Sequence, residues 1–77
     1  MNMIVPLNVL KPGEKGMVVN ILGGAGARQR LVAMGLTPGA TIHVIESHPF
    51  GPIILSVSGT RFAIGRGLAS KVMVRKL

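Results

Sequence analysis

Apolar and polar residues alternate with a period of two in four short segments of the chain. These segments are Thr41–Glu46, Pro52–Gly59, Thr60–Gly65 and Lys71–Lys76. Successive side chains of a strand point to opposite faces, so the alternation predicts four half-buried β-strands. We expect their inward faces to carry Ile42, Val44, Ile53, Leu55, Val57, Phe62, Ile64, Val72 and Val74. An earlier apolar run rich in β-branched residues, Met17–Leu22, predicts a further strand in the centre of the sheet.

Between the apolar run Met17–Leu22 and the strand at Thr41–Glu46, the apolar residues change to helical spacing. Ala27, Leu31 and Met34 recur on one face and predict a helix from about Ala25 to Met34. This helix follows a run of glycines and carries two arginines near its start, at positions 28 and 30. It is the only long helix that the sequence predicts.

The residues directly after this helix predict how it ends. Gly35 supplies the left-handed backbone that terminates many helices. Leu36 falls at the position whose side chain packs back onto the last turn, here against Leu31. Pro38 has no N–H group and prevents the helix from restarting. The stretch therefore predicts a helix, a glycine stop, an apolar contact and a turn.

Two further segments predict single helical turns. Leu7 and Leu10 lie three residues apart, and we expect both side chains to point to the core. Gly67–Ser70 precedes the last strand, and the small Ala69 within it is expected to lie beneath a closely packed neighbour.

The turns complete the predicted architecture. Ser58–Thr60, between two alternating segments, predicts a tight hairpin. Short strands joined by such turns indicate one mainly β domain over residues 1–77. We expect a small, partly open barrel of about five strands, with one short helix after the first strand and a helical turn before the last.

The charge of the chain is strongly unbalanced. Nine lysines and arginines stand against Glu14 and Glu46, aspartate is absent, and the net charge is +7. Such a charge favours acidic partners, whether nucleic acid, an anionic membrane face or an acidic protein. A soluble surface that is basic without any such partner is the alternative.

The residue inventory excludes several classes of chemistry. Cysteine is absent, so disulfides, thiolate zinc sites and cysteine nucleophiles are excluded. The few histidines and glutamates have no spacing that suggests a nucleophile and its base, so we expect no enzyme activity and no cofactor. No apolar run approaches the ~20 residues that cross a bilayer, and the first residues do not resemble a signal peptide. We therefore expect a cytoplasmic protein without membrane insertion.

Two segments are candidates for binding small ligands. Gly23–Arg28 joins a strand to a helix, as phosphate-binding loops do, but it lacks the Walker A lysine and the third glycine of a dinucleotide motif. A flexible connection is the favoured interpretation. His43, Glu46 and His48 are weak candidates for metal ligands, because the two histidines would lie on opposite faces of a straight strand. A transition-metal-responsive module remains an alternative.

A basic RNA-binding module is the second alternative. Small basic barrels bind nucleic acids, and the opening of the chain is similar to KOW-type SH3-like modules. Readers of single strands stack bases on aromatic rings, however, and only Phe50 and Phe62 are available. Binding through Arg61, Arg66 and Arg75 would be salt-dependent and blind to sequence, so we expect no specific nucleic-acid partner.

The order of motifs along nearly the whole chain resembles the FeoA family. Leu7, Leu10 and Gly13 come first and are followed by a strand and by "RQRLVAMGLTPGATIHV". The step Gly51-Pro52 and Ala69, each ahead of a strand, add to the match. The most specific positions are Arg30, Leu31, Met34, Gly35, Leu36, Pro38 and Gly39.

This resemblance implies a fold, a process and a partner. FeoA-like domains are SH3-like barrels, in agreement with the predicted strands. Freestanding members are small cytosolic accessory proteins of ferrous iron transport, thought to act on the FeoB permease through its cytosolic G-protein portion. The domain also forms the C-terminal module of iron-dependent repressors, but this chain lacks a helix-turn-helix. Carried over to this sequence, the helix and turn correspond to Arg28, Arg30, Leu31, Gly35, Leu36, Pro38 and Gly39.

Several apolar residues are left over once the inward faces are assigned. Val32 on the helix, Ile45 and Ile54 at outward strand positions, and Met73 would be exposed on a monomer. A contiguous group of them would mark a contact surface for an acidic or amphipathic partner segment, or for a second copy of the chain. The predicted partner-binding residues are therefore Arg28, Arg30, Leu31, Val32, Gly35, Leu36, Pro38 and Arg61.

Overall fold

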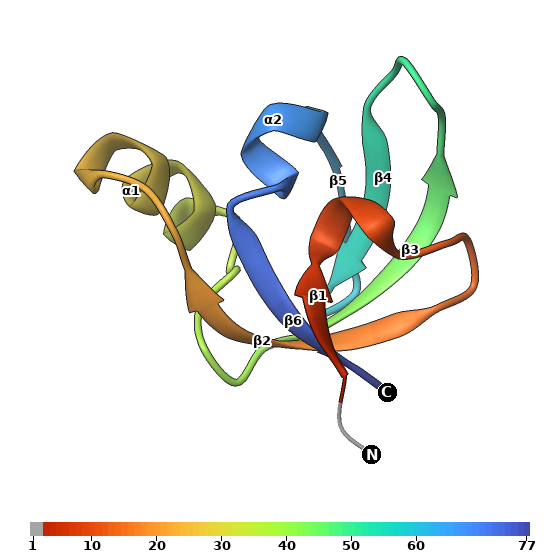
Figure 1. Ribbon diagram of the computed structural model, residues 1–77, viewed down its shortest axis with the longest axis horizontal. Helices are drawn as coiled ribbons and strands as arrows, with labels where there is room; N and C mark the ends of the chain where they lie inside the picture. The colour runs from red at the N-terminus through yellow and green to blue at the C-terminus, as the bar shows by residue number, and fades with distance from the viewer. Residues whose placement is uncertain (1–2) are drawn as a thin grey trace.

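The computed structural model describes residues 3–77, which form six strands and three helical segments (Figure 1). In chain order these are β1 (Ile4–Pro6), the 3-10 helix η1 (Leu7–Val9), β2 (Lys15–Ile21), α1 (Ala25–Ala33), β3 (Thr41–Ser47), β4 (Ile53–Val57), β5 (Thr60–Ile64), α2 (Arg66–Ala69) and β6 (Val72–Lys76). The five predicted strands and the long helix are confirmed. The sequence did not reveal β1, because a strand of three residues is too short for alternation to be seen.

The strands make one antiparallel sheet in the order β1-β6-β2-β3-β4-β5, so β2 is central as predicted. Two bulges interrupt its register. Val19 is an extra residue of β2 opposite β6, and Ile45 is an extra residue of β3 opposite β4. Each bulge increases the local twist, which curls the sheet around its inner face. No pairing joins β1 to β5 in residues 3–77, so the barrel is partly open.

The core fills the inside of the curled sheet. Of the predicted inward residues, all are buried except Phe62, which is half-buried and packs against the core. The two predicted helical turns are confirmed as η1 and α2, and Leu7 of η1, Leu10 directly after it and Ala69 of α2 are buried. The other core residues are Val18, Ile21, Leu31 and Leu36.

Two Pro-Gly turns join the elements. Gly13 and Gly39 both have positive φ, and each turn is closed by a hydrogen bond, from Glu14 N–H to the Lys11 carbonyl at 3.0 Å and from Ala40 N–H to the Thr37 carbonyl at 2.9 Å. Proline followed by a left-handed glycine is the sequence of a type II turn. These turns therefore fix the direction of the chain by local chemistry alone.

The three helical segments gather toward one side of the barrel, the upper side in Figure 1, while β6 runs away from them toward the C-terminus. Among residues 3–77, no helix has both the length and the apolar character to span a bilayer.

Candidate partner-binding surface

The end of α1 is built as the sequence predicts. Gly35 adopts a φ of +85°, its N–H donates to the Val32 carbonyl at 2.9 Å, and the Leu36 N–H donates to the Leu31 carbonyl at 2.9 Å. This pair of hydrogen bonds is the Schellman motif, in which the residue after the glycine packs back onto the last turn. Leu31 and Leu36 are both fully buried in the core. The helix is thus held firmly at its C-terminal end.

This burial corrects the predicted role of two residues. Leu31 and Leu36 expose 0% of their surface, so neither can touch a partner while the chain is folded. They are apolar because they anchor α1 and its turn to the sheet. Their place in the motif reflects packing, whereas Arg30, Gly35, Pro38 and Gly39 of the motif are exposed.

The remaining predicted contact residues are exposed. Arg28, Arg30 and Val32 lie on the outer side of α1, and Val32 exposes 52% of its surface. The other exposed members of the set are Gly35, Pro38 and Arg61. A Cβ atom on Gly35 would lie 3.5 Å from Cγ1 of Val57, so the end of α1 lies beside the last residue of β4. The exposed surface of α1 thus carries two arginines and one large apolar side chain, and whether it binds a partner stays a prediction.

The expected apolar patch around this face is not formed as predicted. Val32 is exposed, but Ile45, Ile54 and Met73 are each half-buried. Ile45 is the extra residue of the β3 bulge, where the strict alternation of faces breaks down. The other two lie on strands with neighbours on both sides, and adjacent side chains cover them in part. They therefore do not form an open contact surface.

Arg66 makes the most extensive set of polar contacts of any side chain in residues 3–77. Its Nε donates to the His48 carbonyl at 2.6 Å, and a terminal nitrogen donates to Oγ of Ser47 at 2.7 Å. The other terminal nitrogen lies 3.4 Å from the Asn8 carbonyl. Arg66 thus ties α2 to the end of β3 and to η1. In the sequence it was only one of several arginines suited to RNA, and its structural role was missed.

The loop that follows β3 carries an unusual aromatic residue. Phe50 lies in the segment between β3 and β4 and exposes 102% of its reference surface. A turn closed from Gly51 N–H to the His48 carbonyl, at 3.3 Å, surrounds Pro49 and Phe50. Arg66 holds the start of this segment through His48 and Ser47. The segment is therefore anchored at its base, while Phe50 contacts none of the core.

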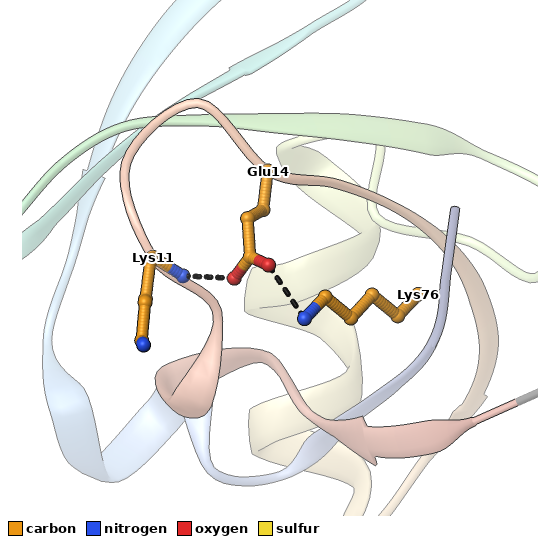
Figure 2. A network of polar contacts seen from close by, with 3 residues as sticks. All are labelled: Lys11, Glu14 and Lys76. Carbon is orange, nitrogen blue, oxygen red and sulfur yellow. Dashed lines mark hydrogen bonds and ion pairs between the residues drawn. The ribbon is translucent and has the colours of Figure 1, made fainter.

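Glu14 joins the first Pro-Gly turn to the last strand, as Figure 2 shows. One carboxylate oxygen accepts the Lys11 N–H at 2.7 Å, and the other lies 2.6 Å from Nζ of Lys76. The hydrogen bond with Lys76, and then the one from Lys11, lower the pKa of Glu14 below its ordinary value of 4.5. This is the sole ion pair in the described residues, so most of the positive charge there is not neutralised by an acidic side chain.

The candidate metal ligands do not gather into a site. His43 is half-buried on β3, Glu46 is exposed near the end of that strand, and His48 is exposed in the loop beyond it. No group of three or more metal-binding side chains comes together anywhere in residues 3–77. The same residues contain no pocket. Among the described residues, Arg28 and Arg30 on α1 and Arg61 on β5 are exposed.

Comparisons with known proteins agree on one family. The model of the family described as "FeoA domain" matches residues 5–76. A protein of Methanocaldococcus jannaschii named "Putative Fe(2+) transport protein A" is 49% identical over 69 residues, which cover 90% of this chain and 83% of that protein.

Solved structures confirm the SH3-like fold. The crystal structure of an iron uptake regulatory protein (FeoA) matches with a TM-score of 0.95 and 73% identity, covering 97% of this chain and all of the other. An NMR structure of a FeoA-like protein from Clostridium acetobutylicum matches with a TM-score of 0.88 and 24% identity, over 100% of this chain and 91% of the other. A manganese-dependent transcriptional repressor is similar in fold, with a TM-score of 0.90 and 18% identity, and all of this chain corresponds to 44% of its length.

Proposed function

The chain belongs to the FeoA family and is an accessory protein of ferrous iron transport, and on this premise we propose that it acts by binding the cytosolic G-protein part of an FeoB-like permease. The protein acts in the cytoplasm, contributes no chemistry of its own, and changes the permease by contact. This proposal names a partner and a mechanism beyond the family membership, and each can be tested separately.

The observation that carries the proposal is the outer face of α1. Arg28 and Arg30 are exposed there with no acidic side chain of residues 3–77 in ion-pair distance, and Val32, one turn after Arg28, exposes 52% of its surface. The helix cannot shift easily, because Leu31 and Leu36 are buried and its last turn is capped. A rigid surface that is already in its bound conformation loses less entropy when it binds. Positive charge also steers an acidic partner into contact.

The experiment is a calorimetric titration of the chain with the soluble cytosolic domain of its permease, at low and at moderate salt. We expect binding that weakens as salt rises, because exposed charges are screened. The double variant Arg28→Glu, Arg30→Glu is expected to weaken binding by roughly tenfold or more, through loss of attraction and added repulsion. Absence of binding by the folded wild-type chain at both salt concentrations would refute the proposal.

The double variant lowers the net charge by four, and a matched control must reproduce that change elsewhere. The first turn and the start of β2 lie away from α1 in Figure 1, and Lys11 in that turn and Lys15 at that strand's start are exposed. The control variant is therefore Lys11→Glu, Lys15→Glu. If the proposal is right, this control loses less affinity than the α1 variant. Equal losses would mean that net charge alone governs binding, and that the face of α1 is not the contact.

A further inference from the structure

The two edges of the sheet differ in their capacity to accept another strand. β1 has only three residues and contains Pro6, which has no N–H to offer. Short edge strands and prolines are common ways of preventing edge-to-edge pairing. β5 has five residues and no proline, and within residues 3–77 it pairs only with β4. One edge of the barrel is therefore blunted, and the other is open.

The hairpin that precedes β5 determines which of its backbone groups are free. Ser58 and Gly59 have φ values of 51° and 81°, so the two-residue turn is of type I′ and closes at the pair Val57 and Thr60. The closing pair of such a hairpin exchanges backbone hydrogen bonds, and the pattern alternates along the ladder. Thr60, Phe62 and Ile64 therefore direct their N–H and C=O groups toward β4.

Arg61 and Ala63 direct their backbone groups away from the sheet. Both residues are exposed, and in residues 3–77 no hydrogen bond reaches their outward N–H or C=O groups. Their side chains share the outer face with Ser56 and Ile54, their partners on β4. The edge thus offers unpaired donors and acceptors at the spacing of a strand, beside a positive charge and a half-buried apolar surface.

We propose that the β5 edge binds an extended acidic segment of the partner protein, which pairs with Arg61 and Ala63 as an added strand. The inference rests on the proposed function, because the partner meant is the cytosolic part of the permease. In an antiparallel pairing, an aspartate or glutamate lies directly opposite Arg61, where opposite charges attract. The residue opposite Ala63 is two positions away on the same face and is apolar, because it covers Ile54.

A second copy of the chain fits this edge less well than an acidic segment does. Two copies joined at β5 would bring together two chains that each have a net charge of +7 and an exposed arginine on the joined edge. Like charges close together oppose association, whereas an acidic segment is attracted. The positive charge of the chain therefore favours an acidic partner over a second copy. The unpaired strand edge favours a partner segment in the extended conformation.

Amide hydrogen exchange measured by NMR tests the placement directly. In the free chain we expect the amides of Phe62 and Ile64 to exchange slowly and those of Arg61 and Ala63 to exchange quickly. Addition of the permease's cytosolic domain is expected to slow exchange at Arg61 and Ala63 by roughly tenfold or more, because their N–H groups become hydrogen-bonded. Binding of the domain with no change at these two amides would overturn the inference and leave the proposed function intact.

Two variants separate the contribution of the backbone hydrogen bonds from that of the positive charge of Arg61. Ala63→Pro removes an outward N–H that makes no bond within the fold, so the chain is expected to stay folded while the edge is blocked. Gly65→Pro is the matched control, because Gly65 lies beyond β5 with a φ of −66° that proline adopts. Arg61→Glu keeps the edge and reverses its charge. We expect Ala63→Pro and Arg61→Glu to weaken binding by roughly tenfold, and Gly65→Pro to leave it near wild type; equal binding by all three overturns the inference.

A peptide probe keeps the test decisive if the permease domain does not bind at all. That result refutes the proposed function, and a short peptide of alternating valine and glutamate then examines the edge alone. Slower exchange at Arg61 and Ala63 with this peptide, and not with its valine-glutamine counterpart, supports the β5 edge as a site for acidic strands. No slowing with either peptide overturns it. A dimer in sedimentation that Ala63→Pro abolishes also overturns it, because the occupant is then a second copy.

Discussion

The end of α1 and the contacts of Arg66 both hold a helical segment to the barrel, but they do so over different sequence distances. At the end of α1 the hydrogen bonds join residues three to five positions apart, from Leu31 to Leu36. Arg66 reaches Ser47 and His48 across 19 and 18 positions, and Asn8 across 58. The first feature uses buried apolar surface and a glycine, whereas the second uses polar bonds at the surface.

The two features differ in how far the sequence alone reveals them. A cap needs a glycine and a leucine at fixed positions after a helix, so its signature is contiguous and can be read from the chain. The partners of Arg66 are two backbone carbonyls and one hydroxyl. Backbone carbonyls are present at every residue and leave no mark on the sequence. A long-range contact of this kind becomes visible only when the fold is known.

The largest expected effect comes from emptying the buried side of the α1 end. Leu36→Ala removes a side chain that exposes 0% of its surface and leaves a cavity beneath the cap. We expect a loss of roughly 2–5 kcal/mol in the free energy of unfolding, measured by urea denaturation. Val32→Ala, on the exposed side of the same helix, is the control and is expected to change stability little. A loss below that of the control would mean that Leu36 does not anchor the helix.

The next effect comes from the backbone of the cap. Gly35→Val places a β-branched residue at a φ of +85°, which costs about 1–3 kcal/mol. The added Cβ meets Val57 at an ordinary contact distance of 3.5 Å, so strain in the backbone is the cause, not a collision. Gly35→Asn is expected to cost less, because asparagine tolerates the left-handed region. Equal stability of the valine variant and the wild type, compared by thermal unfolding, would contradict the assigned helix end.

Arg66→Met tests the long-range feature at similar side-chain size. We expect a loss of about 1–2 kcal/mol in the free energy of unfolding, because polar bonds at the surface contribute less than a buried leucine. The specific readout is amide exchange, which should quicken in residues 47–52 and α2 but not at the end of α1. Arg66→Lys should restore the charge and little else, since an ammonium group cannot make the forked contacts. Uniform quickening along the whole chain would show that Arg66 has no local role.

Much of the fold follows from the sequence because it depends on contacts between neighbouring residues. The alternating strands, the α1 cap and the Pro-Gly turns each rest on neighbouring residues. β1 does not, because Ile4–Pro6 becomes a strand only by pairing with β6. Gly16 is similar: a Cβ there would lie 3.1 Å from Cβ of Val74 and 3.3 Å from Cδ1 of Leu10, a crowding that no local pattern reveals.

The candidate site likewise has some features that neighbouring residues reveal and others that depend on the whole fold. The helix that carries Arg28, Arg30 and Val32 follows from the spacing of its apolar residues, whereas the exposure of these three side chains is a property of the fold. The motif correctly predicted that Leu36 packs back onto Leu31, but it could not show that this packing leaves no surface of Leu36 for a partner. The open edge at Arg61 and Ala63 was also out of reach. It depends on the register of the β4–β5 hairpin and on which strands have neighbours.

The smallest expected effect comes from Glu14, which combines a local and a distant partner in one carboxylate. The Lys11 N–H lies three positions away, whereas Lys76 lies at the far end of the chain. Both lower the pKa of Glu14, so the folded state favours the charged form. Its stabilisation is complete above pH 4.5 and is lost as the pH falls through the lowered pKa. Glu14→Gln should therefore lower the unfolding midpoint slightly at pH 7 and flatten its decline in acid.

Two further variants divide this effect between the two partners of Glu14. Lys76→Met removes only the distant partner, and its loss should shrink in high salt, because an exposed ion pair is screened. The Lys11 hydrogen bond remains in that variant, so part of the acid dependence should persist. Glu46→Gln is the control, because Glu46 is exposed and forms no ion pair with any side chain of residues 3–77. If Lys76→Met abolished the whole acid dependence, the turn would contribute nothing, and the long-range contact alone would stabilise the charged carboxylate.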